Sequence, residues 1–415
     1  MVARRPGASF PSPKRGMLRL VLRRPSSKKR KAAERPPRDS VSYVPQEQMT
    51  DSKQLAELRV QAWCASLLTL MQLTELALIR HLLKIGMLQN FSRCPHCKCG
   101  KLSPLRKDKG RGYVQRCRAK ACQKFVLPHS HHPVFVTSWG NSHIPLRQQV
   151  FVLFCNVARV DQGKIHLITG LGRRVVESVS ARWRKALVAY VEKKQETIQL
   201  GNGRTWSQCE VDEVTCRGKR QGQKVTWFQY CGLLRRGDRR TLVLAKMKVK
   251  STHIKQRGKG KGSAVSPGPI TKTEWRLIAD AYVKGKKILL HSDGARAYRF
   301  CKIPGVITDS VKHKRPKPIY TALWCHVLPK DQSKAHTDLK KLPASEKETV
   351  WVKKGTQLVD NVWRQLKLLG LPKSTKAEDS IVHHRVREFQ WHHWNAEADK
   401  WRAAGETLRL LYRSL

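Results

Sequence analysis

The chain has 415 residues, with 83 lysines and arginines against 30 acidic residues, and a formal net charge of +53. So much positive charge repels itself unless a polyanion offsets it, and nucleic acid binds largely through lysine and arginine. A solvated basic surface or an RNA-binding protein of the ribosomal type would share this composition. The hydrophobic content of 40% is enough for packed cores, and no run reaches the ~18 apolar residues of a membrane span. We therefore expect a nucleic-acid partner and no membrane partner.

Residues 1–50 are rich in proline, serine and arginine and show no sustained periodicity, which predicts a disordered basic segment. The basic cluster at residues 26–31 is typical of a nuclear-import signal. An arginine- and serine-rich start with no acid before Glu34 is also typical of organelle transit peptides. We favour the nucleus; an organelle, or an arm that only binds phosphates, stays open.

Residues 51–89 form the next predicted segment, in which apolar side chains such as Leu68, Leu76 and Leu82 recur at helical spacing. Polar residues interrupt the pattern, so it indicates one or two amphipathic helices rather than a membrane span. We expect core packing as their role.

Five of the twelve cysteines fall between Cys94 and Cys122. Two close pairs of cysteines that meet in space can close a tetrahedral zinc site, and the glycine-containing stretch between the pairs suits a zinc ribbon over residues 90–130. Cys99 and His96 are spare donors. A structural Zn²⁺ site is predicted with four thiolate ligands: Cys94, Cys97, Cys117 and Cys122.

Residues 142–198 contain three helical patterns, at about 146–158, 162–170 and 173–192, joined by short glycine-containing breaks. This order matches a helix-turn-helix DNA-binding domain, although an ordinary three-helix bundle has the same pattern. Valines, a tryptophan and a leucine form an apolar stripe on the third helix. Its outward polar side chains are the predicted DNA contacts: Arg173, Arg174, Ser178, Arg182 and Lys185.

Beyond residue 204 the sequence is typical of strands, over 206–214, 225–234 and 241–249. A basic, glycine-rich loop at 255–268 follows, in which Lys259 and Lys261 are predicted to contact phosphates. A helix over 272–283 and an apolar strand over 287–291 come next. Strands followed by helix, strand and further helices predict an α/β fold with a mixed sheet and flanking helices.

Three aspartates stand out in this basic sequence. Asp212 lies inside an apolar strand, Asp293 follows the end of another, and Asp360 lies in the first turns of a predicted helix. Strand alternation places Glu210 and Asp212 on one face and Glu213 on the other. Carboxylates on two strands and one helix can converge on two divalent ions, the arrangement that phosphodiester chemistry uses. Each acid alone could equally be a surface or capping residue.

The motifs around these acids resemble those of Merlin-type eukaryotic DNA transposases and their bacterial insertion-sequence relatives of the ISXO type. Residues 209–213 (CEVDE) are similar to the family's V-E-x-D-E motif, and residues 292–298 (SDGARAY) to its S-D-G-x-x-x-Y motif. Residues 356–367 (TQLVDNVWRQLK) are similar to its T-Q-x-(I/V)-E-x-x-W-x-x-L-K motif. The resemblance covers roughly residues 90–400.

The resemblance implies a ribonuclease-H-like transposase domain over residues 204–400, in which Asp212, Asp293 and Asp360 are catalytic and hold two Mg²⁺ or Mn²⁺ ions. It implies an enzyme that cleaves double-stranded DNA at terminal inverted repeats and transfers the strands to target DNA. A homodimer is also implied, because two transposon ends must be brought together.

Two features depart from the family pattern. The third acid, Asp360, stands where the family has glutamate, and residues 311–351 are longer and more basic, with His313 the nearest counterpart of the family's histidine. These departures keep open a catalytically inactive or domesticated DNA-binding protein. A ribonuclease or resolvase on the same fold is a third possibility, which the helix-turn-helix pattern makes less favoured.

Overall fold

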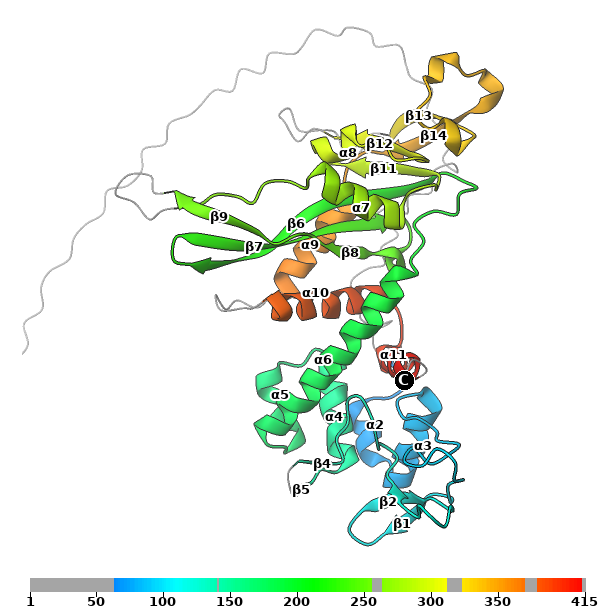
Figure 1. Cartoon of the computed structure of the whole chain (residues 1–415), viewed down its shortest axis with the longest axis vertical. Helices are drawn as coiled ribbons and strands as arrows, with labels where there is room; N and C mark the ends of the chain where they lie inside the picture. The colour runs from blue at the N-terminus through cyan, green and yellow to red at the C-terminus, as the bar shows by residue number, and fades with distance from the viewer. Residues whose placement is uncertain (1–62, 140–141, 256–262, 312–322, 370–378, 413–415) are drawn as a thin grey trace, which may run out of the picture. The chain divides into compact units, whose positions relative to one another are not determined.

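The computed structural model describes residues 63–139, 142–255, 263–311, 323–369 and 379–412 (Figure 1). All of these fall in one compact unit of the chain, residues 41–415. The predicted disordered segment 1–50, the loop lysines Lys259 and Lys261, and His313 lie outside the described residues. No described helix is both long enough and apolar enough to cross a membrane.

A mixed sheet is the centre of the fold. Its strands run in the order β10-β9-β7-β6-β11-β12, and β8 also pairs with β7. The ladders that join β6 to β7, and β7 to β8 and β9, are antiparallel, whereas β11 is parallel to both β6 and β12. The strands are β6 (Ser207–Gln221), β7 (Lys224–Arg235), β8 (Val243–Lys246), β9 (Lys250–Lys255), β10 (Ser263–Ala264), β11 (Ile288–Ser292) and β12 (Val306–Ser310).

The sequence of β11 explains its place in this sheet. All five of its residues are buried, as expected for a parallel strand covered on both faces. The strands predicted at 206–214, 225–234, 241–249 and 287–291 correspond to β6, β7, β8 and β11, so the predicted mixed α/β sheet is confirmed.

Helices cover the sheet. The first is α7 (Lys272–Tyr282), which begins at a capping box formed by Thr271 and Glu274. The helix α9 contacts β6 and β7, and α8 contacts β12. The others are α8 (Arg296–Phe300), α9 (Gln357–Leu369) and α10 (Asp379–Trp394), whereas α11 (Lys400–Tyr412) packs on α3, α4 and α6.

A close approach between α9 and β7 requires glycine. A Cβ atom on Gly232 would lie 2.5 Å from the indole ring of Trp363, which is nearer than real Cβ contacts allow. Gly232 is the register partner of Asp212 on the neighbouring strand. Trp363 therefore packs onto the sheet directly beside Asp212.

A helical segment precedes the sheet. The helices α4 (Leu146–Val157), α5 (Gln162–Thr169) and α6 (Arg173–Glu196) confirm the three predicted helices. Gly170 ends α5 in the left-handed conformation, with φ of +68°, where a residue without a Cβ is favoured. Further upstream, α2 (Leu67–Gln72) and α3 (Glu75–Ile85) account for the described part of the amphipathic segment.

Buried hydrogen bonds join α6 and α10 to each other and to the start of β8. The Gln390 amide on α10 donates to Gln195 Oε1 on α6, at 2.8 Å, and to the carbonyl of Leu242, at 2.9 Å. One hydrophobic core runs without interruption from α2 through the sheet to α11.

Three smaller sheets complete the described structure. The cysteine-rich region has an antiparallel sheet of β1 (Arg106–Asp108), β2 (Gly112–Arg116) and β3 (Phe125–Val126). A hairpin of β13 (Leu323–Pro329) and β14 (Lys347–Lys353) begins in the long basic segment 311–351, where no strands were predicted, and ends two residues beyond it. A short pair, β4 (Ser138–Trp139) and β5 (Ser142–His143), precedes α4.

Candidate metal centres and DNA-binding surface

Four cysteine sulfurs meet at one point of the small antiparallel sheet. The Sγ atoms of Cys94 and Cys122 lie 3.9 Å apart, and those of Cys97 and Cys117 lie 3.7 Å apart. All four lie within 4.8 Å of one another. Sulfurs around a tetrahedral Zn²⁺ with bonds of ~2.3 Å are about 3.8 Å apart. The four predicted ligands are therefore clustered as a structural Zn²⁺ site requires.

Backbone N–H groups near this cluster favour the thiolate form of one of its cysteines. N–H groups of Gly100 and Cys99 donate to the Cys97 sulfur and lower the pKa of that thiol to about 6, which favours the thiolate that binds zinc. A Cβ on Gly100 would lie 2.3 Å from Cys117 Sγ, so only glycine fits there. The spare donor Cys99 is exposed and is not part of the four-sulfur group.

The second cluster lies just past the end of a parallel ladder. The β6–β11 pairing ends at the pair Glu210 and His291. Two residues further along the chain lie Asp212, still on β6, and Asp293, just after the end of β11. Carboxylate oxygens of Asp212, Glu213 and Asp293 lie within 4.8 Å of one another. Two oxygens bound to one Mg²⁺ lie at most about 4.2 Å apart, so these oxygens are within about 0.6 Å of the spacing that a single ion needs. The acidic group is thus arranged as a candidate site for a divalent cation.

Burial and like charge shape the properties of Asp212. Burial raises its pKa to about 7, with further contributions from the negative charges of Glu213, Asp293 and Asp360. The indole Nε1 of Trp363 donates to Asp212 Oδ2 at 2.9 Å. The carboxylate is therefore held in one orientation among acids that repel it, and a bound cation would relieve this repulsion.

Glu213 was not predicted as a site residue. It faces away from α9, as strand alternation requires, and its carboxylate accepts a hydrogen bond from the Tyr298 hydroxyl on α8. Burial raises the pKa of Glu213. The signals that could have indicated it are the adjacent acids at 212–213 and the tyrosine that ends the motif at 292–298.

Asp360 stands apart from this group. It is exposed on α9, accepts a hydrogen bond from Thr356 Oγ1 at 3.2 Å, and is not one of the clustered acids. It is nevertheless near enough for its charge to raise the pKa of Asp212. Residues three apart share a helix face, so Asp360 lies on the side of α9 from which Trp363 reaches Asp212.

A buried ion pair fixes α9 against the sheet. Arg236 Nε lies 2.8 Å from Glu210 Oε1, and both side chains are inaccessible to solvent. The second oxygen, Glu210 Oε2, accepts the N–H groups of Leu358 and Val359 at 2.8 and 3.1 Å. Since these N–H groups belong to the first turn of α9, Glu210 caps the helix that carries Trp363 and Asp360.

Replacing Glu210 by glutamine is expected to destabilise the protein by roughly 3–5 kcal/mol, because it leaves the buried Arg236 without its counter-charge. Urea unfolding measures the loss. The matched control is Glu346→Gln, which breaks the pair with Lys334, whose side chains are 38% and 41% exposed; its effect should be far smaller. Equal losses in the two variants would show that Glu210 does not hold α9.

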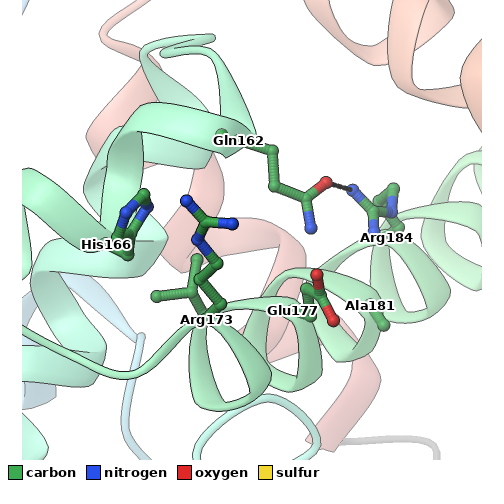
Figure 2. Close-up of a pocket in the computed structure, with 8 residues that line it drawn as sticks. Gln162, His166, Arg173, Glu177, Ala181 and Arg184 are labelled. Carbon is green, nitrogen blue, oxygen red and sulfur yellow. Dashed lines mark hydrogen bonds between the residues drawn. The ribbon is translucent and has the colours of Figure 1, made fainter.

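The predicted DNA-contact residues lie on α6. Arg173, Arg174, Arg182 and Lys185 are exposed, Ser178 is half-buried, and the stripe that includes Trp183 is buried in the core. A hollow of about 640 Å³ lies between α5 and α6, and Figure 2 draws residues of the two helices that line it. Across it, Arg184 Nη1 donates to Gln162 Oε1 at 3.0 Å, which joins the two helices.

If α6 binds DNA, the triple variant Arg173→Ala, Arg174→Ala, Arg182→Ala should bind duplex DNA at least roughly tenfold more weakly. A plot of the logarithm of its binding constant against the logarithm of the salt concentration should also be less steep. The slope should fall by about 0.9 for each phosphate that the variant no longer neutralises. Fluorescence anisotropy at several salt concentrations measures both. A control triple removes equal charge from exposed lysines beside the β13–β14 hairpin: Lys330, Lys340 and Lys341. An equal loss there would mean that binding follows net charge alone.

No family model, no curated protein and no solved structure matches this chain. The structure defines a mixed α/β protein with a four-cysteine cluster and a second, acidic cluster.

Proposed function

We propose that this protein is a metal-dependent DNA transposase, which cleaves strands at the ends of a mobile element and joins them to target DNA. The observation that carries the proposal is the convergence of Asp212, Glu213 and Asp293 within 4.8 Å beside the end of β11. Oxygen donors alone, with no sulfur or nitrogen among them, suit Mg²⁺ or Mn²⁺.

Neighbouring side chains hold the carboxylates of this site in fixed orientations. Trp363 orients Asp212, and Tyr298 orients Glu213, each through a hydrogen bond to the carboxylate. The Glu210–Arg236 pair holds α9, which carries Asp360 outside the cluster but near enough for its charge to act on Asp212. Divalent ions bound there would activate the attacking oxygen and stabilise the leaving oxygen of a phosphodiester.

The remaining features support DNA as the substrate. The net charge is +53, and the exposed arginines of α6 suit phosphate contacts. On the small sheet beside the four cysteines, the guanidinium groups of Arg106, Arg111 and Arg116 lie 4.8–5.9 Å from the centre of the Phe125 ring. We infer that the ribbon and the helix-turn-helix bind terminal inverted repeats, and that the mixed sheet is the ribonuclease-H-like domain implied by the family resemblance. A homodimer and a nuclear location belong to the same proposal.

One observation favours a second function, a DNA-binding protein without catalysis. Asp360 is exposed and outside the acidic cluster, and it is one methylene shorter than the glutamate of the family. Such a protein would bind the same DNA and cleave none.

A plasmid that carries the DNA flanking this coding sequence tests the proposal. The transposase should convert it to nicked or linear forms when Mg²⁺ is added and leave it intact when Ca²⁺ replaces Mg²⁺. Tight binding with no cleavage under Mg²⁺ or Mn²⁺ would favour the second function. Cleavage equal in the two cations would contradict a two-metal mechanism.

A further inference from the structure

A second feature of the mixed-sheet region is a hollow of about 730 Å³ between α7 and α8. Residues from both helices line it, and they combine large apolar surfaces with positive charge. The ones that matter here are Lys272, Arg276, Leu277, Phe300 and Lys302.

The apolar part of this hollow is unusually open to solvent. Phe300 is 58% exposed and Leu277 is 66% exposed. The neighbouring aromatic on the same short helix, Tyr298, is fully buried and bonds to Glu213. One side of α8 therefore contacts the acidic cluster, and its other side presents an aromatic ring to the solvent.

Cations surround this ring. The Nζ atom of Lys272 lies 5.8 Å from the centre of the Phe300 ring, and the guanidinium group of Arg299 lies 5.4 Å from it. Arg276 and Lys302 line the same hollow. The one acid among the described residues that line it, Asp280, is paired with Lys284 at 3.3 Å, so the lining as described is positive.

An exposed aromatic ring with cations around it suits a ligand that carries both a flat ring and negative charges. Bases stack on exposed aromatic rings in single-stranded nucleic-acid sites, while lysine and arginine contact the phosphates on either side. A base inside a duplex is already stacked on its neighbours, so a single ring in a hollow selects an unpaired nucleotide. An acidic peptide would satisfy the charges and leave the ring without a partner.

We propose that the hollow between α7 and α8 binds single-stranded DNA, with a base stacked on Phe300 and the flanking phosphates on Lys272, Arg276 and Lys302. The inference deepens the proposed function, since strand cleavage exposes unpaired nucleotides, and it depends on that function only for its biological role. Binding itself requires neither metal nor catalysis.

Fluorescence anisotropy with labelled dT15 and with a 15-base-pair duplex, without added divalent metal, tests the site in the full chain. Phe300→Leu keeps an apolar side chain and removes the ring, while Phe300→Tyr keeps the ring. We expect Phe300→Leu to lower the affinity for dT15 about tenfold or more. Phe300→Tyr should bind like the wild type, and duplex affinity should be the same in all three proteins.

Three outcomes would overturn the proposal: equal dT15 affinity in Phe300→Leu and the wild type, an equal loss for the duplex, or competition by poly-glutamate that depends on Phe300. Circular dichroism melting checks that the exposed substitution leaves the fold intact. Failure of plasmid cleavage together with the Phe300→Leu defect would leave this site standing and reject the transposase. Plasmid cleavage together with unchanged dT15 affinity in Phe300→Leu would reject this site and leave the proposed transposase activity intact.

Discussion

Asp293→Asn is expected to reduce Mg²⁺-dependent DNA cleavage on the order of a thousandfold while leaving DNA affinity unchanged. The carboxylate of Asp293 lies among the clustered acids at the end of β11, where it would help to hold the ions that stabilise the charge of the transition state. That stabilisation is worth several kcal/mol, and each 1.36 kcal/mol is a factor of about ten in rate.

The matched control for this variant is Glu406→Gln, which removes an equal charge from an exposed position on α11. It should cleave at the wild-type rate. Cleavage of the plasmid at equal rates by Asp293→Asn and the wild type would contradict the assignment of Asp293 to the catalytic centre.

The second large effect is expected for Cys117→Ser, which should abolish zinc binding and unfold the cysteine-rich region. Cys117 is buried, and its sulfur lies 3.7 Å from that of Cys97. The free energy of binding structural Zn²⁺ is largely free energy of folding, about 10–16 kcal/mol in zinc-finger peptides. Metal analysis of the purified protein measures the zinc content, and limited proteolysis reports the folding of residues 90–130.

Cys99→Ser is the control, since Cys99 is exposed and outside the four-sulfur group. This variant should keep its zinc and its resistance to protease. Zinc retained by Cys117→Ser, or absent from Cys99→Ser, would show that the ligands differ from the four clustered cysteines.

Local sequence patterns predicted much of the fold. Regular spacing of apolar side chains indicated α4, α5 and α6 within a few residues of their ends, and a continuous apolar run indicated β11. The cysteine spacing predicted the four-sulfur cluster for a similar reason, because both pairs lie close in sequence and only one long-range approach was needed.

The remaining features depend on contacts between distant residues. Strand alternation placed Glu213 correctly on the face opposite Asp212, yet their carboxylates converge because the β6–β11 ladder ends beside them. The role of Glu210 as a cap for α9 joins residues 148 apart in the chain, which no local pattern encodes. The β13–β14 hairpin lies in a segment whose many lysines obscured its strand pattern.

Titration of the protein with Mn²⁺, followed by electron paramagnetic resonance, reports directly on whether the acidic cluster binds a divalent cation. We predict that the wild type binds Mn²⁺ and that Asp212→Asn, Glu213→Gln and Asp293→Asn each weaken this binding by a factor on the order of ten or more. Asp360→Asn should weaken it less, since Asp360 lies outside the cluster. Unchanged Mn²⁺ affinity in all three cluster variants would contradict the proposed metal centre.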